Sequence, residues 1–119
     1  MTLRIILPAL ALAVGSTGVL AQQAMTFRLA PSDRNPGSCT TADATMSRIQ
    51  TVTIVGETAV LKSNGGINDT AKKAGDGLYR VRWSLGGISY DIEVDTRSQP
   101  AMLSVAEPKI GCKWSGKAG

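Results

Sequence analysis

The 119-residue chain contains no histidine. Histidine is the usual general base near neutral pH, the commonest metal ligand, and the partner that activates serine and cysteine nucleophiles. The sequence also lacks a phosphate loop of the Walker type. These absences count against most hydrolytic mechanisms and most metal sites. We therefore expect a protein that is not an enzyme and that carries no metal or other cofactor.

Cysteine is scarce as well, with only Cys39 and Cys112 in the chain. Redox and metal sites need closely spaced ligands such as Cys-x-x-Cys, and this pair is too far apart for that pattern. We predict one structural disulfide, which closes a loop of about 73 residues and stabilises the fold by up to about 4 kcal/mol in the chain-entropy model. Such a bridge is typical of proteins in an oxidising compartment.

Long apolar runs are missing beyond the N-terminus. Arg4, the apolar residues 5–14 and the small-residue site ending at Ala21 form the three parts of a secretory signal peptide. A membrane anchor would need roughly 20 uninterrupted apolar residues, whereas residues 15–18 read Gly-Ser-Thr-Gly. We predict a signal peptide over residues 1–21, one β domain over residues 22–119, and a periplasmic or secreted protein that does not span the membrane.

No run of basic residues is present. The chain has 13 Lys and Arg against 9 Asp and Glu, and loss of Arg4 with the signal peptide would leave a net charge of +3. This mild excess does not indicate a nucleic-acid-binding protein, although it leaves weak attraction to anionic envelope polymers open.

The sequence does contain short alternating runs of apolar and polar residues, separated by Gly, Asn, Asp and Pro. The clearest pair flanks Gly86-Gly87, which suits the positive φ angles of a two-residue hairpin turn. This turn fixes a register that places one set of residues on an apolar face and another on a face of ion pairs. The apolar face is expected to hold Tyr79, Val81, Trp83, Leu85, Ile88, Tyr90, Ile92 and Val94, and the polar face to pair Arg82 with Asp91 and Arg80 with Glu93.

Further strands are predicted along the rest of the chain. A second hairpin turns at Gly56-Glu57 and places Val52 opposite Leu61 and Ile54 opposite Ala59. Other strands are expected over 25–31, 101–105 and 110–114, while residues 40–48 fit either a helical turn or a strand entry. The expected fold is all-β: a small antiparallel barrel or sandwich of about 6–8 strands with one disulfide.

Neither face of the first hairpin has the features of a site. Carboxylates that face arginines stay ionised, which is the reverse of what a general acid requires. Tyr79, Trp83 and Tyr90 could form an aromatic platform for a sugar, but their position on the apolar face favours core packing.

Two irregular segments remain, residues 30–41 and 63–77. The second is long for a hairpin connection, although it has room for a short strand, and long loops often carry binding residues. We therefore select it as the candidate binding loop, with Asn64, Asn68, Asp69, Lys72 and Lys73 as its polar contacts.

The run "DGLYRVRWSLGG" resembles the MliC-type periplasmic inhibitors of C-type lysozyme, which carry an Asp-Gly-apolar-Tyr…Trp-Ser-x-Gly run. The early and late cysteines are also similar to the disulfide of those small antiparallel barrels. The resemblance covers roughly twenty residues and the cysteine layout. It implies a non-enzymatic protein that inserts loop residues into the active-site cleft of a lysozyme. The inhibitory Ser-Gly-x-x-Tyr pattern is not reproduced here, so no inhibitory residue is carried over.

Together these patterns predict a non-catalytic, exported binding module of the cell envelope. Its partner would be a protein or an envelope glycan, recognised through loops. The alternatives are an inhibitor of a cell-wall hydrolase and a structural envelope protein that binds nothing.

Overall fold

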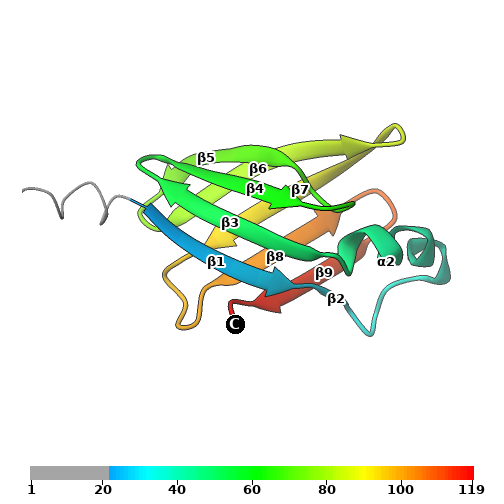
Figure 1. Cartoon of the computed structure of the whole chain (residues 1–119). Helices are drawn as coiled ribbons and strands as arrows, with labels where there is room; N and C mark the ends of the chain where they lie inside the picture. Colours follow the sequence, from blue (N-terminus) through cyan, green and yellow to red (C-terminus); the bar gives the residue numbers. More distant parts are fainter. Residues whose placement is uncertain (1–21) are drawn as a thin grey trace, which may run out of the picture.

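The computed structural model describes residues 22–119, which form a single antiparallel sheet curled into a nearly closed barrel (Figure 1). The predicted signal peptide lies outside these residues. The strands are β1 (Gln22–Arg28), β2 (Ala30–Pro31), β3 (Ile49–Val55), β4 (Thr58–Ser63), β5 (Asp69–Gly75), β6 (Leu78–Leu85), β7 (Ile88–Asp95), β8 (Met102–Glu107) and β9 (Cys112–Lys117). A 3₁₀ turn, η2 (Gly37–Cys39), leads into the only α-helix of the described part, α2 (Thr40–Met46).

The order of the strands around the sheet explains how the barrel closes. That order is β1-β3-β4-β5-β6-β7-β8-β9-β2, so the two ends of the sheet, β1 and β2, are neighbours in sequence. They are separated by Leu29 alone. Strand β1 pairs with β3 at one edge of the sheet. The next strand, β2, pairs with β9 at the other edge, where Ala30 lies opposite Ser115. The prediction of a barrel or sandwich is therefore resolved as a barrel.

The seam between β1 and β9 is held by a few backbone contacts. Phe27 forms an isolated bridge with Ala118, and the Gly119 amide donates to the Thr26 carbonyl over 3.0 Å. At Gly116 the backbone of β1 comes so close that an added Cβ would overlap the carbonyl oxygen of Arg28. A larger residue at position 116 would therefore have to push β1 away from β9.

Both predicted hairpins are confirmed in register. Trp83 pairs with Tyr90 and Arg82 with Asp91 across β6 and β7, and Val52 pairs with Leu61 across β3 and β4. The turn glycines have the expected positive φ, 59° at Gly86 and 83° at Gly87. Because side chains alternate in a strand, each register sends one set inward and leaves the other in water.

The barrel interior is filled by side chains contributed by all the long strands. Its largest fully buried members are Phe27, Met46, Gln50, Val52, Leu61, Ile67, Ile92, Val94, Leu103, Val105 and Trp114. Gln50 is the polar exception, and its amide is satisfied by the backbone of Ile67, which donates to Oε1 and accepts from Nε2. An interior of this kind is a packed core rather than a channel.

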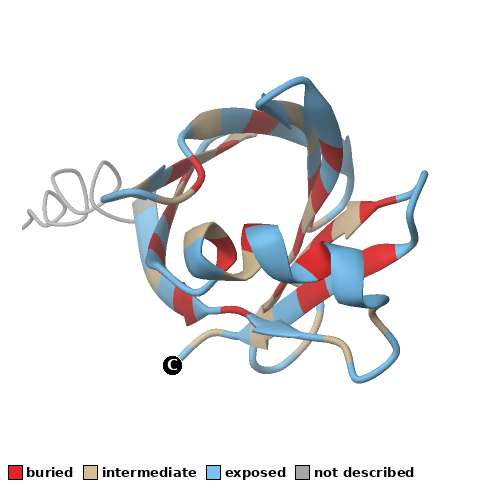
Figure 2. Cartoon of the chain, turned by 90° about the vertical axis from the view of Figure 1, so that its right-hand side faces the viewer, coloured by how far each residue is buried: buried red, intermediate tan, exposed pale blue. Residues whose placement is uncertain are grey.

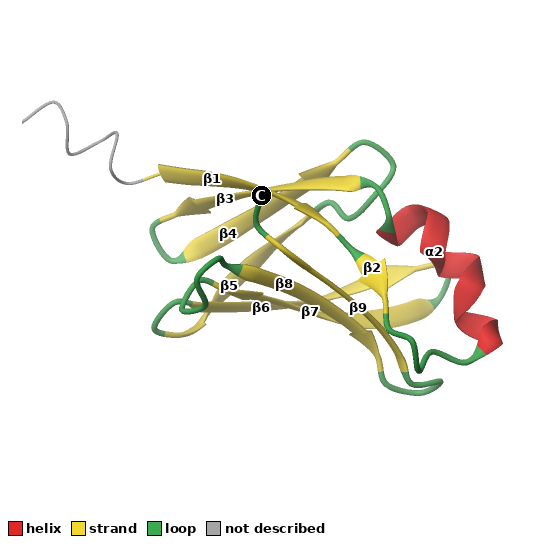
Figure 3. Ribbon diagram, turned by 90° about the horizontal axis from the view of Figure 1, so that it is seen from below, coloured by secondary structure: helices red, strands yellow, loops and turns green. Residues whose placement is uncertain are grey.

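Helix α2 covers one mouth of the barrel (Figures 2 and 3), which we call the helix end. The predicted disulfide is present between Cys39, just before α2, and Cys112 on β9, with a Cα–Cα distance of 5.8 Å. The indole of Trp114 donates to Asp43 of α2 over 2.8 Å. The sequence of residues 40–48 fitted either a helical turn or a strand entry. Most of this segment forms the short helix α2, which the disulfide and the indole hydrogen bond join to β9.

Two strand predictions need correction. Within the segment 63–77, residues 69–75 form strand β5, longer than the short strand that the sequence left room for; Ser63 ends β4, and residues 64–68 and the turn at 76–77 are irregular. Ile110, expected to begin the last strand, lies in the turn before β9 and is 45% exposed. The turn forms there because Glu107, Pro108 and Gly111 favour a reversal, and Gly111 has φ 94°.

Within residues 22–119 no helix is long and apolar enough to cross a membrane.

Gly116→Ala should destabilise the protein by about 1–3 kcal/mol, because the methyl group must push β1 away from β9. The matched control is Gly75→Ala, where an added Cβ meets nothing within 4 Å. Urea unfolding of both variants measures the difference. Equal midpoints for the two variants would show that the seam is not tightly closed.

Candidate functional site

The outer face of the first hairpin carries the predicted ladder of ion pairs. Arg82 Nε lies 3.0 Å from Asp91 Oδ1, and Arg80 Nε lies 3.2 Å from Glu93 Oε1. Ser104 and Ala106 of β8 complete an open depression over these pairs. Since each of the four charges already faces an opposite charge, this face has little to offer a charged ligand.

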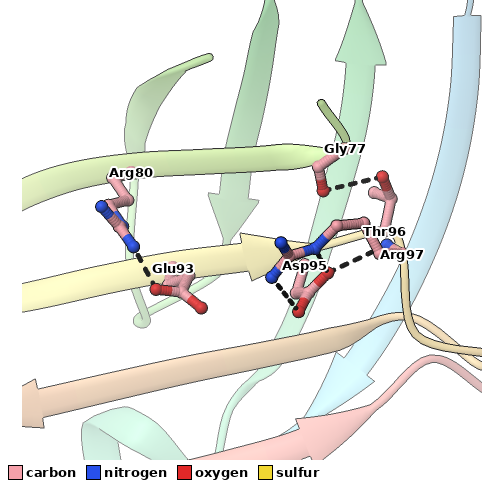
Figure 4. A network of polar contacts seen from close by, with 6 residues as sticks. All are labelled: Gly77, Arg80, Glu93, Asp95, Thr96 and Arg97. Carbon is pink, nitrogen blue, oxygen red and sulfur yellow. Dashed lines mark hydrogen bonds and ion pairs between the residues drawn. The ribbon is translucent and has the colours of Figure 1, made fainter. Parts of the chain in front are cut away.

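A second polar cluster lies at the end of the barrel opposite α2, where β7 leaves the sheet (Figure 4). Arg97 binds Asp95 through both carboxylate oxygens, with Nε–Oδ1 at 2.9 Å and Nη2–Oδ2 at 3.0 Å. Thr96 donates its amide and its hydroxyl to the carbonyl of Gly77. The cluster therefore ties the β5–β6 turn to the chain that follows β7. The hydrogen bond from the Arg97 side chain is the main reason that the pKa of Asp95 falls from 3.8 to about 2.

The aromatic side chains of the hairpin point inward. Tyr79 and Tyr90 are buried, and Trp83 is half-buried against the core. Tyr90 packs between Trp83 and Trp114, with ring centroids 5.7 and 6.0 Å away. Burial raises the pKa of the Tyr90 phenol, and the nearby Glu107 carboxylate raises that pKa further. Tilted against one another and packed inward, the rings present no continuous platform to a sugar.

The predicted binding loop is held together by its own polar groups. Asn68 accepts from the Ser63 amide over 3.1 Å and donates to the Ser63 carbonyl over 3.0 Å. Asp69 accepts from the amide of Thr70. Asn68 and Asp69 therefore have a role in shaping the turn, whereas the side chain of Asn64 has no hydrogen bond to another described residue.

Lys72 and Lys73 do not belong to that loop. They lie on β5, where Lys72 pairs with Thr58, and the Lys73 amide donates to the Glu57 carbonyl in the β3–β4 turn. The Lys73 ammonium lies 3.7 Å from Asp76. At about 3.3 Å per residue along a strand, both lysines are far from Asn64 and near the opposite end of the barrel. The five residues predicted as one loop site are thus divided between the two ends.

A different surface lies on the two turns at the helix end. Leu85 and Ile88 flank the β6–β7 turn and are 40% and 39% exposed, and Ile110 in the β8–β9 turn is 45% exposed. We call these three side chains the apolar rim. An open groove of about 560 Å³ runs between the turns and is lined by Arg82, Gly87, Ile88, Ser89, Asp91, Glu107, Pro108, Lys109 and Ile110.

Glu107 explains why Ile110 faces the solvent. Its buried carboxylate accepts from the amides of Lys109, over 3.0 Å, and Ile110, over 2.7 Å. Its carbonyl accepts from the Gly111 amide over 2.9 Å. A carboxylate held by backbone amides fixes the turn. Consequently the side chain of Ile110 projects outward and cannot fold over the core.

The two cations beside the apolar rim differ in whether a carboxylate faces them. Arg82 is occupied by Asp91, whereas the ammonium of Lys109 has no carboxylate within 4.0 Å among residues 22–119. No group of three or more Cys, Asp or Glu side chains is placed to hold a metal ion in the described part of the chain. The rim thus combines exposed aliphatic surface with one available positive charge.

Comparison of the chain with protein-family models, with curated proteins and with solved structures gave no match in any of the three. The site is therefore interpreted from its own residues.

Sequence reasoning missed the apolar rim because it assigned all three aliphatic residues to strand interiors. Leu85 and Ile88 follow the inward alternation of β6 and β7, but they lie next to the turn, beyond the part of the interior that other strands cover. The available signal was their position directly beside Gly86-Gly87.

Stability should depend on pH through Asp95. The pKa of Asp95 is lower in the folded protein than in the unfolded chain, so its ionised carboxylate stabilises the fold. This stabilisation is complete above about pH 4 and is lost as the pH falls toward the folded value of about 2. Asp95→Asn should therefore unfold at a lower temperature than wild type at pH 6, and this difference should shrink toward pH 2.

Thermal unfolding followed by circular dichroism from pH 2 to pH 7 checks this expectation. Asp33→Asn, which changes an exposed aspartate outside any ion pair of the described chain, is the control. If the unfolding temperatures of Asp95→Asn and wild type differ by the same amount across the pH range, Arg97 does not lower the pKa of Asp95.

Proposed function

We propose that this protein is a non-catalytic binding module of the cell envelope, periplasmic or secreted, that recognises a partner protein through the apolar rim. The observation that carries the proposal is the placement of three exposed aliphatic side chains on two neighbouring turns at the helix end: Leu85 pairs with Ile88, and Ile88 lines one groove with Ile110. Contiguous apolar surface of this kind marks protein-binding sites more often than single exposed aliphatic residues do.

The shape of the surface indicates what the partner offers. The β6–β7 turn projects beyond the neighbouring strands (Figure 1), and β6 and β7 are joined by hydrogen bonds along their whole length. A projecting, preorganised turn loses little conformational entropy on binding. It fits a concave apolar cleft, and a carboxylate at the edge of that cleft would face Lys109.

The absence of catalysis and the location remain parts of the proposal. The chain has no histidine, and Asp91, Glu93 and Asp95 are all engaged by arginines. The disulfide Cys39–Cys112 fits an oxidising compartment. The predicted signal peptide would direct the protein there.

An inhibitor of a cell-wall hydrolase is the sharper alternative. The favouring observation is the scaffold: an antiparallel barrel whose early and late cysteines are joined, as the resemblance to the lysozyme inhibitors implies. In this alternative the projecting turns would enter the active-site cleft of the hydrolase. A structural envelope protein without a partner is the remaining alternative, and it leaves the apolar rim without a role.

Capture from an envelope extract tests the proposal. Leu85→Ser and Ile110→Ser together should reduce capture of the partner at least about tenfold, because each removes exposed aliphatic surface from the interface. The matched control is Val55→Ser, which changes an aliphatic side chain of similar exposure, 39%, beside the β3–β4 turn at the opposite end. Because the changed side chains are exposed, all variants should unfold at similar urea concentrations.

The result that contradicts the proposal is equal capture by wild type and the double variant, or loss of capture in the Val55 control alone. Adding a C-type lysozyme to the same experiment separates the alternatives. Inhibition of its activity by wild type and not by the double variant would identify the partner as a cell-wall hydrolase.

A further inference from the structure

A second surface at the helix end lies near the last turn of α2, whereas the apolar rim lies near its first turn. It is an open depression of about 520 Å³ between β1, α2, β3 and the 64–68 loop. Its lining consists of Arg28, Ala44, Ser47, Arg48, Ile49 and Asn64. Two arginines share this depression, and no acidic residue lines it.

The β1–β3 pairing brings the two arginines together although 19 residues separate them in sequence. Arg28 pairs with Ile49, so it lies beside the residue that follows Arg48. Neither guanidinium has a carboxylate within 4.0 Å among the described residues. By contrast, Arg80, Arg82 and Arg97 all have one. The depression therefore concentrates positive charge that the protein itself does not neutralise.

The Arg48 side chain lies against the 64–68 loop. Gly65 has φ 85°, and an added Cβ there would lie 3.4 Å from Arg48 Nε. The loop itself is fixed by Asn68, which bonds Ser63 on one side and Gly66 on the other. Asn64, the neighbour of Gly65, has no side-chain hydrogen bond within residues 22–119, so its amide is available to a ligand.

A helix C-terminus can also attract an arginine through its free carbonyl groups. Here three of the last four carbonyls already have donors: the Ser47 amide and hydroxyl bind Asp43 and Ala44, and the Arg48 amide binds Thr45. The Arg48 guanidinium is therefore not required to cap α2.

We propose that this depression binds a phosphate group. Two guanidinium forks and one amide line the same open depression, and together they offer more donors than the two oxygens of a carboxylate can accept. A phosphate has enough oxygens for both forks, and its charge matches the two cations. Ala44 and Ile49 add apolar surface beside the charge, which suits a phosphate monoester on a larger molecule as well as inorganic phosphate. This inference does not depend on the partner proposed for the apolar rim.

Titration with sodium phosphate, followed in ¹H–¹⁵N spectra, tests the site. The amides of Arg48, Asn64 and Gly65 should shift and saturate, whereas sodium chloride at equal ionic strength should leave them nearly unchanged. Arg28→Gln together with Arg48→Gln should weaken the phosphate affinity by about tenfold or more, because each change removes a charge-assisted pair. Each single variant should lie between wild type and the double variant.

Arg34→Gln is the matched control, because Arg34 is exposed and outside any ion pair of residues 22–119 but does not line the depression. Its affinity should equal that of wild type. The spectra also report whether each variant is folded, and the single variants keep the test valid if the double variant unfolds.

A second titration with glycerol 3-phosphate identifies the source of the group. Tighter binding of the monoester would indicate a phosphate-bearing molecule, and equal affinity would indicate inorganic phosphate; both support the site. The proposal is overturned by shifts that do not saturate, by equal shifts with chloride, by tighter binding of acetate, or by an affinity unchanged in the double variant.

Discussion

A β-barrel closes where the two edges of its sheet meet. In this protein they meet at the seam between β1 and β9. One residue, Leu29, separates pairing with β3 from pairing with β9. Gly116 lets the two backbones approach, and Cys39–Cys112 fastens the segment after β2 to the start of β9. The sheet edges that would remain open in a sandwich are thereby largely removed.

Closure also makes the two ends of the barrel different. At one end the Gly77–Thr96 bonds join the β5–β6 turn to the chain that follows β7, where Arg97 pairs with Asp95. At the other, α2 covers the mouth, with the apolar rim beside its first turn and the two arginines beside its last turn. The helix end carries four of the five exposed large aliphatic side chains of the described residues, all but Val55, together with the two unpaired arginines of one depression, and so we assign recognition to it.

Much of this fold could be predicted from the sequence because local chemistry determines it. Gly86-Gly87 fixes a hairpin register, and that register places Arg82 against Asp91 and Trp83 against Tyr90. The site was harder, because it depends on contacts between distant segments. Arg28 and Arg48 meet only through the β1–β3 pairing. Lys72 was assigned to a loop because alternation in β5 is weak, with small or polar residues on both faces.

The most direct test of recognition by the helix end is hydrogen–deuterium exchange of the protein with and without the partner captured from envelope extract. We expect added protection of residues 84–89 and 108–111, which carry the apolar rim, and unchanged exchange at the opposite end in residues 56–57, 76–77 and 96–100. Protection confined to the opposite end, or none at the apolar rim, would contradict this expectation.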